Sequence, residues 1–333
     1  MNSFGPRLAK LMRSRETSIL LAFVAVVAVT TAVNPTFLFS PDGWRNLLAN
    51  PSILIVLAVG EAFVIITKSV DLSVGSIMGL TAFLVGSVYI AWPTMPPVLA
   101  FVVGVAFGCA LGFVNGGLVA VAKVPGMVIT LGTLYAFRGV NIMWAGSRRI
   151  NASELSPDFL AIGNAQILRL PLITIMAVLV LLGAAWYLRN MRSGREFYAI
   201  GSAPAAAELY GLPTRRRMLA AFMVSGAMAG LAGVLFAARY GTVASNAGSN
   251  YELQAIGAAV IGGVAIVGGS GTVIGAAFGA LLLTTINSAL PVLGIQSFWQ
   301  RAVVGVLIIG AIVLDRVLAQ RQKRRLVAER MTP

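Results

Sequence analysis

The feature that most constrains this chain is a series of apolar stretches, each near twenty residues long, separated by short polar breaks. A helix of about 20 apolar residues spans the hydrocarbon core of a bilayer. The chain has 333 residues, of which 58% are hydrophobic and 11% are charged, whereas a soluble domain is about 25% charged. We therefore predict an all-α, polytopic membrane protein with about ten transmembrane helices, some of them broken or short.

The expected spans follow from apolar runs bounded by Pro, Gly or charge. They are 18–33, 52–67, 72–91, 98–122, 126–145, 171–188, 218–238, 253–267, 272–290 and 302–318. An alternative with eight spans and two re-entrant loops satisfies the same pattern. The first run lacks a small-residue cleavage site, so it reads as a transmembrane helix and not as a signal peptide.

Lys and Arg gather in three segments: an N-terminal segment (1–17), a central loop (189–217) and a C-terminal tail (319–333). Cytoplasmic loops of membrane proteins collect these residues, so all three segments are expected in the cytoplasm of a bacterial inner-membrane protein. The ten-span topology then places eighteen basic residues inside and six outside. This asymmetry explains the net charge of +14 without a nucleic-acid partner. We expect one permease domain, 1–333, surrounded by membrane lipid.

Several chemistries are excluded by composition. The sequence has no histidine and a single cysteine, Cys109, which removes the usual general base, any intrachain disulfide and a cysteine metal cluster. A phosphate-binding loop would need a Gly-Lys-Ser/Thr ending, which the Gly-rich stretch near Gly268 lacks. We predict no catalytic residue, no metal and no cofactor in this chain.

Polar residues interrupt the apolar pattern at two places. The first is 66–76, in which Asp71 is placed as a helix N-cap that accepts from the N–H of Ser73 or Val74. The second is the Gly-rich stretch that contains Gly269 and Ser270. Two interpretations remain for each break: it is a structural cap or turn, or it is part of the permeation path or gate.

Two intramembrane charges and two asparagines are further candidates for the path. Glu61 and Arg138 lie inside apolar segments, either as a buried pair or as contacts for a polar solute. Asn115 and Asn287 follow two similar glycine patterns, Gly75 to Gly79 and Gly271 to Gly275, which suggest two related halves. The asparagines bond either a sugar hydroxyl or a neighbouring helix.

The central loop predicts one short helix, with Pro204 in its first turn and Gly211 as its terminator. It fits either docking into a partner's groove or lying at the lipid headgroups. The predicted helix comprises Ala203, Pro204, Ala205, Ala206, Ala207, Glu208, Leu209, Tyr210 and Gly211.

These segments resemble the permease subunits of bacterial ABC importers for ribose and related monosaccharides. Val70 to Gly75 is similar to the family's I-D-L-S-V-G signature, and Gly116 to Gly139 to its N-G-x-L-V-A…V-P…T-L-G-T…R-G block. Ala199 to Gly211, with the glycine-rich return at 262–271, is similar to its coupling loop. The chain departs from the family at Lys68-Ser69, where a Gly pair is typical, at Gly126, where a second Pro is typical, and at Ala205, where Glu is usual.

The resemblance implies ATP-driven import of a monosaccharide or a similar small polar solute. It implies a second permease subunit, identical or different, cytoplasmic ATP-binding subunits that hold ATP and Mg²⁺, and an extracytoplasmic sugar-binding protein. The 203–211 helix would be the coupling helix. The rivals are an ion-coupled secondary transporter, which needs a membrane-embedded acidic relay, and a membrane-embedded enzyme, for which paired carboxylates or a metal cluster are lacking.

Overall fold

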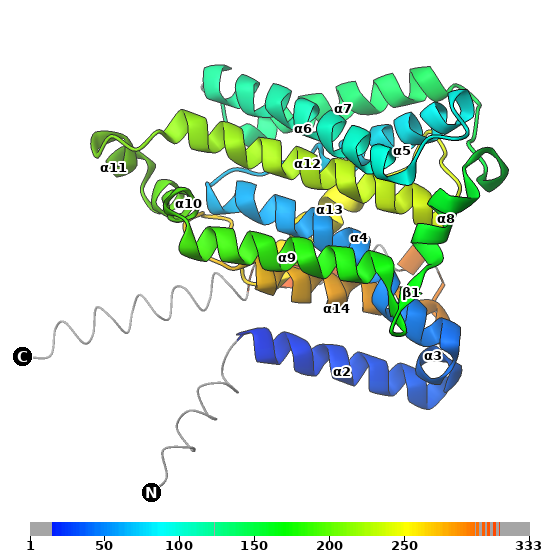
Figure 1. The fold of residues 1–333 in the computed structure, drawn as a ribbon. Helices are drawn as coiled ribbons and strands as arrows, with labels where there is room; N and C mark the ends of the chain where they lie inside the picture. Colours follow the sequence, from blue (N-terminus) through cyan, green and yellow to red (C-terminus); the bar gives the residue numbers. More distant parts are fainter. Residues whose placement is uncertain are drawn as a thin grey trace, which may run out of the picture.

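The computed structural model describes residues 15–122, 124–296, 298, 299, 302, 303, 305, 306, 309, 310 and 313. Its helices run side by side as one bundle (Figure 1). The longer helices are α2 (Arg15–Val33), α4 (Pro41–Ile66), α5 (Val74–Ala91), α6 (Pro97–Ala122), α7 (Gly126–Ala145), α9 (Leu172–Asn190), α12 (Thr214–Tyr240) and α14 (Val273–Val292). The shorter elements are α3 (Thr36–Phe39), η1 (Ala152–Glu154), α8 (Pro157–Asn164), β1 (Gln166–Ile167), β2 (Leu170–Pro171), α10 (Arg192–Ser202), α11 (Pro204–Leu209) and α13 (Tyr251–Ile261).

Seven helices of the described residues are long and apolar enough to cross a membrane, which confirms an all-α polytopic membrane protein. They are α2, α4, α5, α6, α9, α12 and α14. The expected count of ten is not reached. The fifth expected span is present as α7, but its hydropathy is too low for it to be counted among these seven helices. The helix α13 has only 11 residues, because the backbone turns at Gly262. The tenth, 302–318, falls mostly outside the described residues, as do most of the N-terminal segment and the tail.

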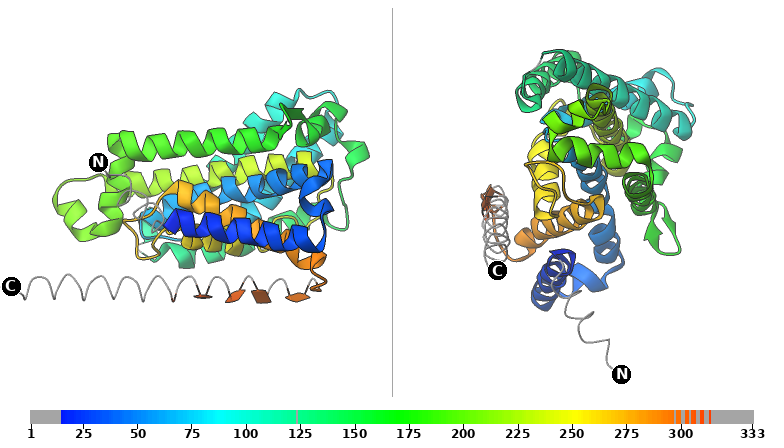
Figure 2. Two further views of the ribbon diagram at one scale, coloured as in Figure 1. Left: turned by 90° about the horizontal axis from the view of Figure 1, so that it is seen from below. Right: turned by 90° about the vertical axis from the view of Figure 1, so that its left-hand side faces the viewer.

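The core of the bundle is α4, which other helices surround. From Ala49 to Ile66 the helix is almost entirely buried, and it contacts α12, α14, α9 and α13. The helix begins at Pro41, earlier than the expected 52, because Ser40 caps it by accepting from the N–H of Gly43 at 2.9 Å and Pro51 is accommodated inside the helix. By contrast, α2 lies along the edge of the bundle and packs on α14 (Figure 2).

The most extensive helix contact is that of α6 with α12. Glycines recur at every fourth position of α6 (Gly104, Gly108, Gly112 and Gly116); the first three face Gly226 or Gly230 of α12, and the fourth faces Leu219. A Cβ added at Gly108 would overlap the carbonyl oxygen of Gly226. Small residues let membrane helices approach to backbone contact, and here they fix α6 against α12.

The two ends of the bundle differ. The α10 and α11 helices gather at the end where α2 begins, whereas α3, α8 and the β1–β2 hairpin lie at the opposite end (Figures 1 and 2). The predicted loop therefore contains two helices, of which only the second was predicted; Gly194 and Gly201 lower the helix propensity of the first, α10.

Candidate functional site: two helix breaks and two buried polar clusters

The first break, residues 67–73, joins the end of α4 to the start of α5 inside the bundle. Asp71 is fully buried, and its Oδ1 accepts from the backbone N–H of Ser73 at 3.0 Å and from the Ser73 hydroxyl at 2.6 Å. Its Oδ2 accepts from the hydroxyl of Ser225, on α12, at 3.0 Å. Three donors on one carboxylate provide the hydrogen bonds that a buried charge requires.

Three further polar side chains complete this cluster, which we call the Asp71 cluster. Glu61 of α4 accepts the backbone N–H of Asp71 at 3.0 Å through Oε1. Asn115 of α6 donates from Nδ2 to the Ser73 hydroxyl at 2.7 Å. Thr130 of α7 accepts the N–H of Leu72 at 3.1 Å. Helices α4, α6, α7 and α12 therefore all bond to a seven-residue stretch of chain.

Two buried atoms of this cluster have no hydrogen-bond partner within the described part of the chain. They are Glu61 Oε2 and Asn115 Oδ1. An unpaired buried oxygen costs about 1–3 kcal/mol. The cluster can therefore still accept hydrogen bonds from water or from a polar solute.

The structure corrects two predictions made for these residues. Asp71 is not the N-cap, because α5 begins at Val74 and Ser73 holds that position; the predicted bond from the Ser73 N–H to Asp71 is present. Glu61 and Arg138 do not pair, because Glu61 faces the first break while Arg138 faces α13.

Arg138 belongs to a second cluster, formed by α7, the 241–250 segment and α13. Its guanidinium bonds the Ser249 hydroxyl and lies 3.7 Å from the Glu252 carboxylate. One turn further along α7, Asn141 donates to the carbonyl of Ser245 at 2.9 Å. Four buried atoms here have no hydrogen-bond partner among the described residues: Arg138 Nε and Nη2, Asn141 Oδ1 and Glu252 Oε2. Arg138 Nη2 and Glu252 Oε2 are the two atoms of the 3.7 Å ion pair, so Arg138 Nε is left as an unpaired donor and Asn141 Oδ1 as an unpaired acceptor.

The second break, residues 262–272, is built from backbone. Gly263, Gly268, Gly269 and Gly271 have positive φ, and the N–H of Gly269 donates to the carbonyl of Ile66 at 2.9 Å. Ser270 contributes its carbonyl, which accepts from Ala265 N–H at 3.1 Å. The second break therefore bonds directly to the last residue of α4, where the first break starts.

Asn287 does not occupy a place equivalent to Asn115. Asn115 lies in α6, the helix after the first glycine pattern, whereas Asn287 lies in α14, the same helix as the second pattern. Asn287 donates to Gln254 of α13 at 3.4 Å. Each asparagine bonds a neighbouring element, which is the helix-joining alternative.

The predicted short helix is present as α11, one residue after α10. Pro204 starts it, and Gly211 follows its end with φ +73°. Ala207 is buried, whereas Leu209 and Tyr210 are 89% and 87% exposed. A helix end that exposes a leucine and a tyrosine in this way has the surface of a docking element.

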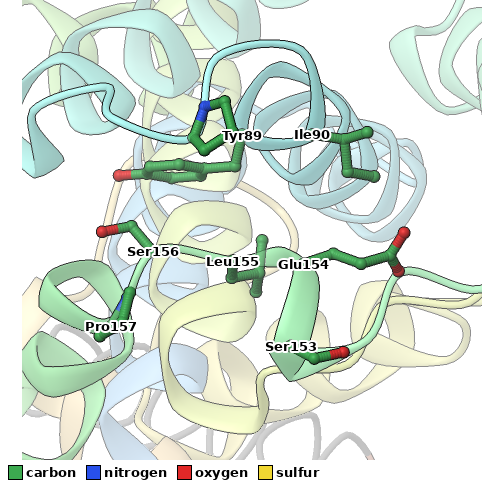
Figure 3. Close-up of a pocket in the computed structure, with 8 residues that line it drawn as sticks. Tyr89, Ile90, Ser153, Glu154, Leu155, Ser156 and Pro157 are labelled. Atoms are coloured by element: carbon green, nitrogen blue, oxygen red, sulfur yellow. The ribbon is translucent and has the colours of Figure 1, made fainter.

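A pocket of about 360 Å³ opens at the other end of the bundle, between the end of α5 and the η1–α8 segment. In Figure 3 the Tyr89 ring lies over Ser156 and Leu155, with Glu154 at the far side. The N–H of Asn151 and the guanidinium of Arg148 hold the pKa of Glu154 below its usual range. The Tyr89 hydroxyl is buried and has no hydrogen-bond partner among the described residues.

The sequence did not single out Ser225, Thr130 or Asn141, which are members of the two clusters. Ser225 sits in a small-residue segment of α12 that contacts α4 and α6, and a polar residue there was the available signal. Asn141 lies three residues after Arg138, so it shares its helix face, which the sequence could also have indicated.

Comparison with known proteins places this arrangement in a class. The family described as "Branched-chain amino acid transport system / permease component" matches residues 44–312, and the chain belongs to this family of ABC-transporter permeases. It is thus a multi-pass inner-membrane protein.

Among individual proteins, the chain is similar to the autoinducer 2 import system permease protein LsrC. The identity is 38% for the protein of Enterobacter sp. (strain 638), over 97% of this chain and 94% of the relative. For Klebsiella pneumoniae it is 36%, over 97% of this chain and 93% of the relative. For Salmonella typhimurium it is 36%, over 95% and 90%. No solved structure matches the chain. The predicted resemblance to sugar-type ABC importer permeases is confirmed.

Proposed function

We propose that this chain is the transmembrane permease subunit of an ATP-driven importer for a small polyhydroxylated solute, such as autoinducer 2 or a monosaccharide. Full-length similarity to autoinducer 2 import permeases supports this function. The observation that carries it is α11, which projects from one end of the bundle (Figure 1) and ends in the exposed Leu209 and Tyr210. ATP hydrolysis resides in cytoplasmic partner subunits that bind this helix.

The proposed topology has ten spans in two related halves, with α7, α13 and 302–318 completing the count. The basic residues of 189–217 support a cytoplasmic location for α10 and α11, and those of the N-terminal segment and the tail support the same location for both termini. The extracytoplasmic binding protein then delivers the solute to the end that carries the Tyr89 pocket. A second permease, identical or different, completes the path.

The proposed path residues come from the two clusters and the second break, with Asn287 of α14 in addition: Glu61, Asp71, Ser73, Asn115, Arg138, Gly269, Ser270 and Asn287. The Arg138 cluster supports a hydroxylated solute. Each hydroxyl group both donates and accepts a hydrogen bond, which suits the unpaired donor Arg138 Nε beside the unpaired acceptor Asn141 Oδ1.

The test is purification of the chain in mild detergent together with whatever accompanies it. We expect an ATP-binding subunit, and we expect its ATP hydrolysis to fall when Leu209 and Tyr210 are both changed to Ser, since the docking surface is then lost. A chain that purifies alone and transports under an ion gradient would instead establish a secondary transporter.

A further inference from the structure

The two helix breaks meet at a single carbonyl group. The carbonyl of Ile66, at the end of α4, accepts the N–H of Gly269 at 2.9 Å. Carbonyls in the last turn of a helix have no partner within that helix, so this bond also completes the end of α4.

Helix α10 lies directly against this junction. A Cβ added at Gly201 would overlap both the Ile66 carbonyl oxygen and the Gly269 nitrogen. On either side of Gly201, the Tyr198 hydroxyl donates to the carbonyl of Gly271 at 3.1 Å, and the Ser202 hydroxyl donates to that of Gly269 at 3.4 Å. One helix therefore contacts the second break and the residue from which the first break starts, and it does so over little more than one turn.

The same helix is fixed to α4 and to α12. Phe197 packs edge-on against Phe63 of α4, with ring centroids 5.7 Å apart. Glu196 bonds the guanidinium of Arg217, in the first turn of α12, at 2.6 Å. On its other side only Ala203 separates α10 from α11, whose tip is exposed. A displacement of α11 must therefore move α10 or break these contacts.

We propose that α10 transmits movement of α11 to both breaks at once, with Gly201 as the positioning residue at the point of contact. This inference rests on the proposed function, because α11 moves only if an ATP-binding subunit holds it. It adds the route by which the movement reaches the clusters. From Ile66 the first break leads within five residues to Asp71, whose N–H bonds Glu61.

The experiment uses the full chain with its ATP-binding subunits in lipid nanodiscs, with Cys109→Ala as the background. One spin label is placed at Ala205 of α11, which is exposed and leaves Leu209 and Tyr210 intact, and in a second sample at Val267 of the second break, which is 75% exposed. The mobility of each label is recorded with and without ATP and vanadate. We expect both labels to respond in the background protein.

Gly201→Ala should abolish the response at Val267 and leave that at Ala205, because the added methyl separates α10 from the junction. The matched control is Gly183→Ala in α9, where an added Cβ meets nothing within 4 Å, and both labels should still respond. Should Gly201→Ala not fold, Tyr198→Phe removes only the bond to Gly271 and is expected to weaken the Val267 response at least twofold.

An unchanged response at Val267 in Gly201→Ala, or in Tyr198→Phe where that variant is used, would overturn the inference and leave the proposed function intact. No response at Ala205 in the background protein would count against the proposed function itself, and the inference would fall with it.

Discussion

Both helix breaks must hold an irregular backbone inside the bundle, but they are stabilised by different interactions. The first break fixes its backbone through side chains, because Asp71, Ser73, Thr130 and Ser225 supply its hydrogen bonds. The second fixes its backbone with positive-φ glycines and main-chain bonds. A polar break inside a membrane bundle can therefore be stabilised by side-chain hydrogen bonds or by glycine conformations with main-chain bonds, and the two kinds of break should respond differently to mutation.

The largest effect is expected where glycine is irreplaceable. Gly269→Ala places a methyl group at φ +75° within 2.6 Å of the Ser202 backbone. Left-handed strain and overpacking together should destabilise the protein by about 4 kcal/mol. Thermal unfolding of the purified protein in detergent measures this. The control is Gly132→Ala in α7, where the space is open and stability should hold or rise slightly. Equal stability of the two variants would show that the second break tolerates side chains.

In the first break the largest effect should come from the carboxylate. Asp71→Ala leaves the Ser73 N–H, the Ser73 hydroxyl and the Ser225 hydroxyl without their acceptor. We expect a loss of about 2–3 kcal/mol in the same measurement. A variant as stable as the native protein would mean that this break, too, is held by backbone alone.

A smaller loss, about 1 kcal/mol, is expected for Ser225→Ala, which removes one of the three donors. The double variant with Asp71→Ala should lose less than the sum of the two single losses, because both changes remove the same bond. Strict additivity would show that the 3.0 Å bond between them contributes nothing.

The smallest effect has the opposite sign. Lys68 lies in the first break with φ +68°, a conformation that suits glycine. Lys68→Gly relieves about 1–2 kcal/mol of strain and loses about half of that through greater freedom of the unfolded chain, so a gain of about 0.5–1 kcal/mol is expected. Lys68→Ala keeps the strain and should leave stability unchanged. If alanine stabilises equally, the lysine side chain and not the backbone is the cause.

Part of the fold and of the first break could be predicted from the sequence. Apolar runs predicted most of the long helices, because burial in lipid demands about 20 apolar residues in a row. The polar residues of the first break were visible for the same reason, since each is costly in an apolar segment. The family resemblance also identified Lys68 as a departure from the Gly pair that is typical there. In the structure Lys68 has a left-handed backbone conformation, which explains why glycine suits this position.

What the sequence could not supply was pairing across the bundle. The partners of Arg138 depend on which helices face each other, and no spacing rule relates residues more than a hundred positions apart. Helix ends were also misjudged: α13 stops at Ile261, although apolar residues continue to Val267, because Gly263 has φ +94° and the N–H groups of Gly263 and Val264 bond back to the last turn. The α10 helix was not predicted, because Gly201 lowers the helix propensity of its segment, whereas in the structure any side chain there would overlap the Ile66 carbonyl.

The glycine contacts of α6 and α12 have a consequence for sites far from either break. Asn115 sits on the glycine-bearing face of α6, between Gly112 and Gly116, and it reaches Ser73 from there. Any substitution that adds bulk at Gly108 or Gly226 must drive the two helices apart and draw Asn115 with them. A larger side chain near the middle of this helix pair would thus disturb the buried hydrogen bonds from a distance. Substitutions at these positions can therefore impair transport although they replace no polar residue.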